Sequence, residues 1–426
     1  MTKKLAKIIA QNQHRISRTQ ISQNIINILE TIKKAGFSAY IVGGGVRDLL
    51  LSHKPKDFDI ATDATPEQVR GLFRNSRIIG RRFKLIHIFF GREIIEVATF
   101  RTSPQAEQTN NKEQPSNDSH LTVDGRIIRD NIYGSLDDDI WRRDFTINAL
   151  YYDAIDEQIT DYCNGYLDLN NHVIKMLGDP ETRYREDPVR MLRAIRFAAK
   201  LDFTIEQKTL EPLKNYEFIN LLDGIPRARL FEEYNKLFLT GHAEKSFYLL
   251  KKYKLLHKLF PLTATAKIEE QYPEHLSFLH AVLKSTDQRI MNNLPVNPAF
   301  LIAAFLWHPM LQEHSKLCHK KTTREVFWRE AALKIIKKQN DCLAIPKRFT
   351  LVMEDIWYLQ RLFMKPHPKS IYKAAYHSKF RAGFDFLMLR SELEPMDKSK
   401  LAFWKEYESS DEKKRADILD DYAEQF

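Results

Sequence analysis

The spacing of apolar and polar positions differs between the first and second parts of this chain. In the first part, short apolar runs bounded by glycine or charged residues are typical of strands, and they stand between segments with helical spacing. From Pro180 onward the pattern is almost wholly helical. We therefore expect a small mixed α/β domain followed by a helical remainder.

The same pattern predicts individual elements. Strands are expected at Ala39–Val42, Phe58–Ala61, Leu85–Phe90 and Ile94–Phe100, and again between residues 145 and 176. Helices are expected at Ile21–Lys34, Val46–Ser52 and Pro66–Arg74. Residues 103–120 hold no aromatic or large aliphatic side chain, so they cannot contribute to a core. A flexible loop over a site and a neutral insertion are both open interpretations of that segment.

Composition narrows the class of protein. A chain of 426 residues predicts two to four domains. Its 66 basic and 56 acidic residues give a net charge of +10, which suits a polyanionic partner, although a merely basic soluble protein has the same balance. We find no apolar run of about eighteen residues and no signal peptide, so we expect a cytoplasmic protein without a membrane span. The three cysteines are expected to be reduced thiols (Cys163, Cys318, Cys342).

A pair of carboxylates is the first candidate for chemistry. Asp57 and Asp59 are two residues apart, so on a strand they would point to the same face and turn Phe58 inward. Parallel carboxylates repel each other unless cations neutralise them, and Mg²⁺ is the natural match for such oxygen ligands. Two ions about 3.5–4 Å apart can activate a hydroxyl and stabilise a leaving pyrophosphate. A surface turn is the competing interpretation of the pair.

A glycine turn just before this pair favours a metal and phosphate site over a surface turn. Gly43, Gly44 and Gly45 join a predicted strand to a predicted helix, where backbone N–H groups can face a phosphate. Arg47 in the first turn of that helix can add charge-assisted hydrogen bonds. The alternative is a helix start that merely needs glycine.

Further polar residues lie on later elements. Glu96 is the one carboxylate on an otherwise apolar strand, so it is either a third metal ligand or the polar end of an exposed strand face. Trp141–Leu150 is predicted to start a helix. On it, Arg142 and Arg143 can grip triphosphate oxygens, and Asp144 can accept from a ribose hydroxyl or complete the carboxylate set.

Asn148 lies four residues after Asp144, on the same helical face, and can touch sugar or base. Asp187 is predicted to cap a helix that begins with Pro188. Asp187 and Arg190 are three apart, so the carboxylate and the guanidinium together match an adenine edge, and they match a cytosine edge as well. Arg193 continues the stripe and can reach a phosphate.

In this order, the motifs GGxVRD, DxD, RRDFTxNAL and EDPxRxLRAxRF resemble the class II tRNA nucleotidyltransferase/poly(A) polymerase family, over roughly residues 38–240. The family belongs to the polymerase-β-like nucleotidyltransferases. Gly80–Ile88 (GRRFKLIHI) and the tail near Phe380–Arg390 are similar to its bacterial poly(A) group rather than to its CCA-adding members. A Trp at position 141, where the family usually has a smaller residue, is a departure.

The resemblance implies an α+β fold, in which a polymerase-β-like head with a small mixed sheet precedes an all-helical neck, body and tail. The expected boundaries are a basic helical extension at 1–36, a catalytic head at 37–178, a base-recognising neck at 179–240, a body at 241–345 and an RNA-binding tail at 346–426. It further implies that Asp57 and Asp59 hold the metals, with Glu96 and Asp144 competing for the third carboxylate place. Nucleotide-binding residues are expected at Gly43, Gly44, Arg47, Arg142, Arg143, Asn148, Asp187, Arg190 and Arg193.

The expected reaction is template-independent addition of AMP from ATP to RNA 3′ ends, with two Mg²⁺ ions, or Mn²⁺ in their place. A CCA-adding tRNA nucleotidyltransferase and a non-catalytic RNA-binding relative are the alternatives. In the tail, Tyr372 and Tyr376 interleave with lysines and could stack RNA bases, whereas an amphipathic helix with a solvated basic face explains the same pattern.

Overall fold

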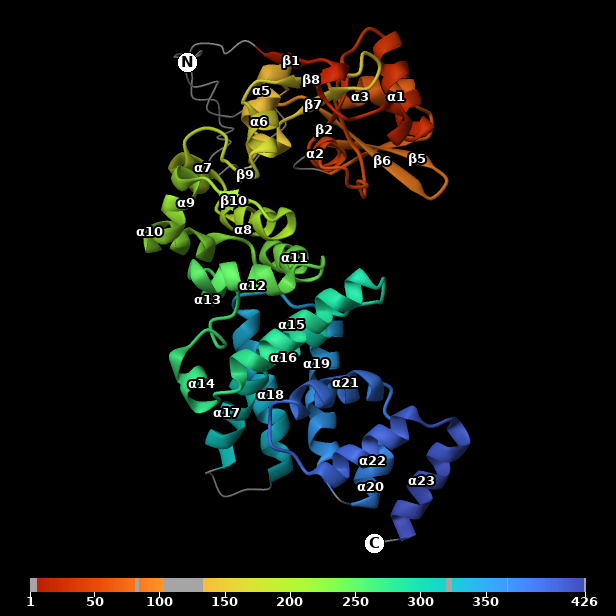
Figure 1. Cartoon of the computed structure of the whole chain (residues 1–426), viewed down its shortest axis with the longest axis vertical. Helices are drawn as coiled ribbons and strands as arrows, with labels where there is room; N and C mark the ends of the chain where they lie inside the picture. The colour runs from red at the N-terminus through yellow and green to blue at the C-terminus, as the bar shows by residue number, and fades with distance from the viewer. Residues whose placement is uncertain (1–5, 81–83, 103–132, 319–323, 366, 425–426) are drawn as a thin grey trace. The chain divides into compact units, whose positions relative to one another are not determined.

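The computed structural model describes residues 6–80, 84–102, 133–318, 324–365 and 367–424. The predictions for residues 81–83 and for the segment 103–120 fall outside these described residues. The chain divides into two compact units, Met1–Leu221 and Leu222–Phe426 (Figure 1). The finer division into extension, head, neck, body and tail stays a prediction.

The first unit is built on a mixed sheet. In the described residues it has eight strands in the order β1-β8-β7-β2-β3-β6-β5-β4. Strands β3 and β6 run parallel and the other neighbours run antiparallel, which confirms the expected mixed sheet. The strands are β1 (Lys7–Ile9), β2 (Ala39–Val42), β3 (Asp59–Thr62), β4 (Ser76–Ile79), β5 (Leu85–Phe90), β6 (Glu93–Thr99), β7 (Tyr151–Asp153) and β8 (Gln158–Asp161).

Helices accompany the sheet within this unit. Helix α1 buries Ile25, Ile28, Leu29 and Ile32, which recur at helical spacing and form one apolar stripe toward β2. Each such buried side chain contributes roughly 1.5–3 kcal/mol relative to exposure. The helices are α1 (Gln23–Lys34), α2 (Gly44–Leu50), α3 (Pro66–Leu72), α5 (Leu136–Trp141), α6 (Gly165–Asn170), α7 (Pro180–Glu186), α8 (Val189–Leu201), α9 (Gln207–Leu210) and α10 (Tyr216–Asn220), with the 3₁₀ helix η3 (Thr146–Asn148) and the small parallel pair β9 (Val173–Ile174) and β10 (Thr204–Ile205).

Two local predictions in this unit are wrong. Trp141–Leu150 does not start a helix, because helix α5 ends at Trp141. That helix begins earlier in the chain than predicted, where Ser135 and Asp138 form a reciprocal capping pair. The N-terminal segment predicted as helical contains strand β1, which pairs antiparallel with β8 and completes one edge of the sheet.

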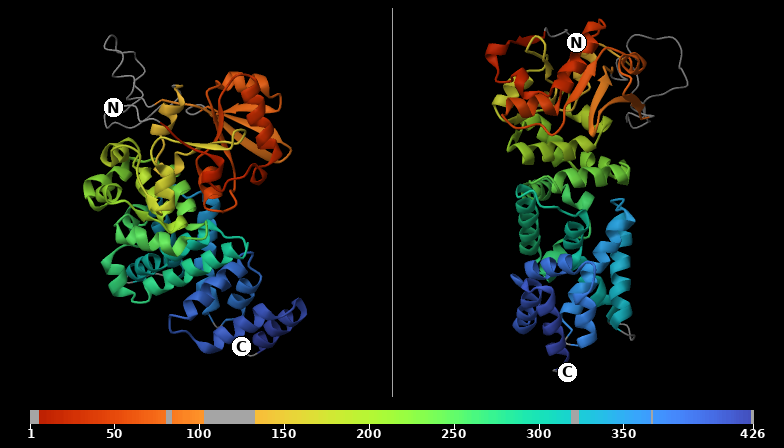
Figure 2. Two further views of the ribbon diagram at one scale, coloured as in Figure 1. Left: turned by 45° about the horizontal axis from the view of Figure 1, so that its top comes forward. Right: turned by 90° about the vertical axis from the view of Figure 1, so that its right-hand side faces the viewer.

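The second unit is helical throughout its described residues, as predicted (Figure 2). Its long helix α19 packs against α16, α18, α20 and α21. The buried Trp357 of α19 donates its indole N–H to the Ala303 carbonyl of α16, which fixes the two helices. The helices are α11 (Arg227–Phe238), α12 (Ala243–Lys252), α13 (Leu256–Leu259), α14 (Ala266–Gln271), α15 (His275–Met291), α16 (Pro298–Phe305), α17 (Trp307–Cys318), α18 (Arg324–Asn340), α19 (Lys347–Phe363), α20 (Pro368–Ala375), α21 (Phe380–Ser391), α22 (Lys398–Ser409) and α23 (Glu412–Glu424).

Two further expectations concern the whole chain. Across the described ranges, no helix combines the length and the apolar character needed to cross a membrane. Cys163, Cys318 and Cys342 are all free thiols, as expected.

Candidate active site

Three carboxylates gather where β3 and β6 pair. In this parallel register Asp59 lies opposite Glu96, and Asp57 precedes Asp59 by two residues. Strand β3 begins at Asp59, so Asp57 lies just before the strand rather than on it, in contrast to the prediction that both are strand residues. Desolvation, followed by the charges of Glu96 and Asp57, raises the pKa of Asp59 to about 6, whereas Arg143 lowers it. Such a cluster of like charges has the character of a cation site.

The structure separates the two candidates for the third carboxylate. Glu96 is exposed beside Asp59, and one of its oxygens lies 3.4 Å from Nε2 of His87. Asp144 is buried and accepts hydrogen bonds from Arg193, from Asn148 and from the backbone N–H of Phe145. Burial by itself would raise the pKa of Asp144, but Arg193 and these hydrogen bonds hold it well below the usual range. Asp144 is therefore a buried anion with its own partners, and Glu96 is the carboxylate beside Asp59.

The glycine turn lies against the carboxylate segment. Gly43 has φ +70°, which strongly favours glycine, and a β-carbon there would stand 3.2 Å from Nη1 of Arg143. A β-carbon on Gly45 would stand 2.9 Å from the ring of Phe58. The missing side chains thus let the turn approach both Arg143 and the residue between the two aspartates. The sequence predicted helix α2 from Val46, but it begins at Gly44.

A chain of buried polar contacts runs behind the turn. Arg47, 3% exposed, donates from Nη1 to Oδ1 of Asn148 at 2.7 Å and from Nε to Oδ1 of Asp48 at 2.8 Å. Asn148 donates in turn to Asp144, which accepts from Arg193. Arg47 and Asn148 therefore connect helix α2, the η3 turn and helix α8, and both are almost wholly covered.

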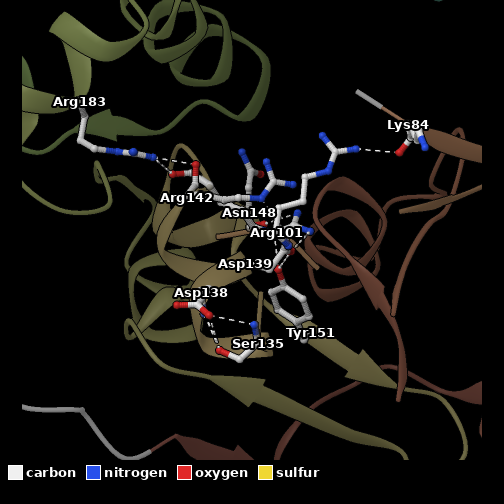
Figure 3. Close-up of polar contacts among 10 residues, drawn as sticks. Lys84, Arg101, Ser135, Asp138, Asp139, Arg142, Asn148, Tyr151 and Arg183 are labelled. Carbon is white, nitrogen blue, oxygen red and sulfur yellow. Dashed lines mark hydrogen bonds and ion pairs between the residues drawn. The ribbon is translucent and has the colours of Figure 1, made fainter. Parts of the chain in front are cut away.

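A second network centres on Asp139, a residue that the sequence reasoning missed (Figure 3). Its carboxylate accepts from Nε of Arg142 at 2.8 Å, from Nη2 of Arg143 at 3.3 Å, from the Tyr151 hydroxyl and from the backbone N–H of Arg101. Burial would raise the pKa of Asp139, but Arg143 and then Arg142 lower it to about 2. The acidic run just before WRRD was the available signal, because neighbouring arginines need anionic partners when they are partly buried.

Arg183 links α7 to the same segment, and the sequence reasoning missed it as well. Its Nη2 donates to the carbonyls of Arg142 and Arg143 at 2.7 and 2.6 Å (Figure 3). This contact fixes the backbone on which both arginines are carried. Arg183 is buried and pairs with Glu186 on its own helix.

The residues expected to read the base lie where α7 gives way to α8. Asp187 is half-buried, and its side chain accepts from the backbone N–H of Val189, the first residue of α8, at 3.3 Å. The N-cap position of α8 falls to Pro188, one residue later than predicted, and Asp187 ends α7. Arg190 is buried and donates through Nη1 to Glu186 at 2.9 Å and to the Arg183 carbonyl at 2.7 Å. The sequence did not indicate that Glu186 would hold Arg190.

The arrangement has a definite chemical character. A solvent-open cluster of three carboxylates adjoins a glycine turn, and Arg143 lies at both. Cations on the carboxylates and a polyphosphate at the turn and the arginine are complementary charges within one site. Fold and site together define a nucleotidyltransferase with a polymerase-type head.

Comparison with known proteins gives a more specific assignment. Residues 39–175 match the family described as "Poly A polymerase head domain", residues 202–267 "Probable RNA and SrmB- binding site of polymerase A", and residues 322–426 "Polymerase A arginine-rich C-terminus". Poly(A) polymerase I of Salmonella typhi is 46% identical over 409 residues, which is 95% of this chain and 86% of that protein. The chain belongs to the bacterial poly(A) polymerase I family, and it is an enzyme of the polynucleotide adenylyltransferase class.

The CCA-adding enzymes are more distant. The CCA-adding enzyme of Lactobacillus helveticus is 38% identical over 248 residues, 58% of this chain and 57% of that protein. A crystal structure of the Bacillus stearothermophilus CCA-adding enzyme with CTP superposes with a TM-score of 0.59 at 23% identity, over 89% of this chain and 80% of that one. This likeness confirms the predicted fold class.

Proposed function

We propose that the chain adds AMP from ATP to RNA 3′ ends without a template and releases pyrophosphate. The observation that carries the proposal is the cluster of Asp57, Asp59 and Glu96 beside the Gly43 turn and Arg143. Family membership supports polyadenylation as the outcome of nucleotidyl transfer.

The carboxylate cluster fits two divalent ions, Mg²⁺ or Mn²⁺. Asp57 and Asp59 would hold them, and Glu96 takes the third place for which Asp144 also competed. Desolvation, followed by the charges of Glu96 and Asp57, raises the pKa of Asp59 to about 6, and a cation bound there would offset both effects. When bound, such ions would lower the pKa of the attacking 3′ hydroxyl and neutralise charge on the departing pyrophosphate.

The chain's own groups would then position the nucleotide. Gly43 and Gly44 allow close approach of phosphate oxygens to backbone, and Arg143 and Arg142 supply guanidinium donors on a backbone that Arg183 fixes. Asp139 orients both arginines by accepting from each.

The buried Arg47 and Asn148 are assigned a different role from direct contact with triphosphate or sugar. Their donors and acceptors are joined to each other and to Asp48 and Asp144, so we assign them to positioning the glycine turn against α8. Arg193, held by Asp144, supports the nucleotide at the end of this chain of contacts.

The base would be read by Asp187 and Arg190. Arg190 makes its hydrogen bonds with described residues through Nη1, which leaves Nε and Nη2 to face an incoming base. A carboxylate and a guanidinium match adenine, and catalysis is then a matter of positioning and electrostatics.

One assay separates the three candidate activities. Purified protein with Mg²⁺ and each NTP in turn is given either a generic RNA or a tRNA that lacks CCA. Long tails made from ATP alone on generic RNA are the expected result. Addition that stops after CCA on the tRNA would identify a CCA-adding enzyme, and no incorporation would favour a binding protein.

Variants of the carboxylates complete this test. Asp57→Ala and Asp59→Ala should each abolish addition while RNA affinity stays within about threefold, because RNA is held mainly by other surfaces. Asp63→Asn is the matched control, since Asp63 is an exposed carboxylate four residues from Asp59 whose acceptor for the Ser38 N–H is retained by asparagine. A comparable loss of RNA binding in the alanine variants would show that the pair is structural.

A further inference from the structure

A second group of acidic and imidazole side chains lies wholly in the helical unit. It joins Glu274 just before α15, His308 on α17 and Glu394 just after α21. Nε2 of His308 lies 3.3 Å from Oε1 of Glu274 and 4.0 Å from Oε1 of Glu394. The three ligand atoms all lie within 4.8 Å of one another.

The imidazole of His308 points an unsatisfied atom into this group. The side chain is 0% exposed, and its Nε2 has no hydrogen-bond partner within the part of the chain that the structure describes, even though the carboxylate is near. A buried polar atom without a partner costs roughly 1–3 kcal/mol, so the atom calls for a ligand.

The neighbouring His275 shares a proton with His308. The two Nδ1 atoms are 2.9 Å apart, so one of them carries that proton. Nε2 of His275 is also buried without a hydrogen-bond partner among the described residues. In the tautomer in which His275 accepts, His308 donates from Nδ1 and its Nε2 lone pair faces Glu274 and Glu394.

A cation between the lone pair and the two carboxylates would satisfy all three groups. The buried Nε2 of His308, which has no hydrogen-bond partner among the described residues, is the observation that points to such a ligand. We propose that Glu274, His308 and Glu394 together bind one divalent transition-metal ion, for which Zn²⁺ is the best match.

Ligand type and spacing support zinc over magnesium. One imidazole nitrogen and two carboxylate oxygens suit Zn²⁺, whereas Mg²⁺ prefers oxygen ligands alone. With Zn–ligand distances of about 2.1 Å in tetrahedral geometry, the ligand atoms of one ion lie about 3.4 Å apart. The 3.3 Å between His308 and Glu274 matches this spacing, and the 4.0 Å between His308 and Glu394 exceeds it. The two glutamates are partly exposed and can close the remaining gap between their oxygens.

The surroundings resemble those of a metal ligand set. Nδ1 of His308 shares a hydrogen bond with Nδ1 of His275, which fixes the ring orientation as an outer partner does in zinc sites. Arg390 donates hydrogen bonds to Glu394, and its Nε lies 3.1 Å from each carboxylate oxygen. An ion here would join the starts of α15 and α17 to the segment after α21, so its role is to stabilise the helical unit.

Zinc binding can be measured on the full chain after the carboxylates of the head are replaced, so that they do not bind metal. In the Asp57→Asn/Asp59→Asn background, stripped of metal with chelator, we expect one equivalent of Zn²⁺ to bind with Kd below about 1 μM and to raise Tm. Glu274→Gln and Glu394→Gln should each weaken uptake at least tenfold and remove the rise in Tm. Glu274 is only partly buried, so Glu274→Gln should retain the fold. Glu394→Gln also removes the charged partner of buried Arg390, so its Tm without zinc is measured alongside, and His308→Gln serves as a third change.

Two controls make the result specific. Glu270→Gln and Glu392→Gln change exposed glutamates near the same elements and should leave zinc uptake unchanged. Cys318→Ser removes a competing thiol that lies 3.4 Å from His314, and uptake should persist. Three results would each overturn the proposal: loss of zinc in Cys318→Ser, unchanged uptake in both Glu274→Gln and Glu394→Gln, or no uptake tighter than about 100 μM in the background protein.

Discussion

At the scale of single residues, the most informative group is Asp59. It lies beside Asp57 and Glu96, and desolvation, followed by their charges, raises its pKa to about 6. Asp139 is the opposite case, because Arg143 and Arg142 outweigh its burial and lower its pKa to about 2. Among the described residues Arg143 offsets only part of the charge around Asp59, whereas Asp139 is paired with both Arg142 and Arg143.

This difference predicts a pH dependence. Protons compete with Mg²⁺ for Asp59, so activity at subsaturating Mg²⁺ should fall roughly tenfold per pH unit below about 6, and high Mg²⁺ should move the fall to lower pH. Glu96→Gln removes one neighbouring charge and should shift the acid limb to lower pH. The measurement is AMP addition from pH 5 to 7.5, with each variant normalised to its own maximum. ATP titrates alike for both proteins, so an unshifted limb in Glu96→Gln would contradict the assignment.

The same groups affect stability with opposite signs. The pKa of Asp59 is raised in the folded state, so this group makes the metal-free protein less stable as pH rises from about 4 through about 6. The pKa of Asp139 is lowered, so its contribution is present above about pH 4 and is lost as pH falls toward 2. The Asp59 effect stays below about 1 kcal/mol because that side chain is open to solvent.

At the scale of elements, the site depends on how closely the η3 turn is held. Gly165 opens helix α6 against this turn, and a β-carbon there would stand 2.2 Å from the carbonyl oxygen of Thr146. The turn carries Asn148, and the backbone just before it carries Arg143. A glycine outside the recognisable motifs therefore controls the position of residues within them.

Gly165→Ala should accordingly destabilise the protein by about 1–3 kcal/mol and reduce adenylate addition, because the turn must shift to admit the methyl group. Gly71→Ala on helix α3 is the matched control: nothing lies within 4 Å of its added carbon, so alanine should be neutral or stabilise by about 0.5–1 kcal/mol. Urea unfolding and initial rates give both quantities. Equal stability of the two variants would contradict the close packing at Gly165.

At the scale of the whole molecule, the chain combines a nucleotide-adding head with a basic helical unit. Its net charge of +10 favours salt-sensitive RNA binding. The two tail tyrosines are not equivalent: Tyr376 is 72% exposed, whereas the Tyr372 hydroxyl donates to Asp420 at 2.7 Å. Their rings are stacked at 6.3 Å, so Tyr376 presents the outer face.

If this face stacks on RNA bases, Tyr376→Ala should weaken binding to single-stranded RNA about fivefold or more. Tyr372→Phe, which keeps the ring and removes only the bond to Asp420, should leave affinity almost unchanged. Fluorescence anisotropy at several salt concentrations measures both. Equal affinities for wild type and Tyr376→Ala would leave the amphipathic helix with a solvated basic face as the better interpretation.

Much of the fold was predictable because its signals are local. Strand β2 and strand β5 occupy the residues that their apolar runs predicted, and the short Asp-Pro sequence at 187–188 placed the start of α8 to within one residue. The helix expected at Trp141–Leu150 is absent from those residues because a capping pair at Ser135 and Asp138 starts α5 earlier, and α5 ends at Trp141. Strand β1 is only three residues long, and its place depends on pairing with distant β8.

The sequence by itself determined the chemistry, because motifs such as DxD and RRD carry their charges at fixed spacing wherever they fold. Only the tertiary structure places Glu96 rather than Asp144 beside Asp59, since this depends on the β3–β6 register and on Arg193 reaching Asp144. It also decided that Arg47 is buried against Asn148. These contacts join residues far apart in the chain, and no local pattern records which distant partner will satisfy a buried charge.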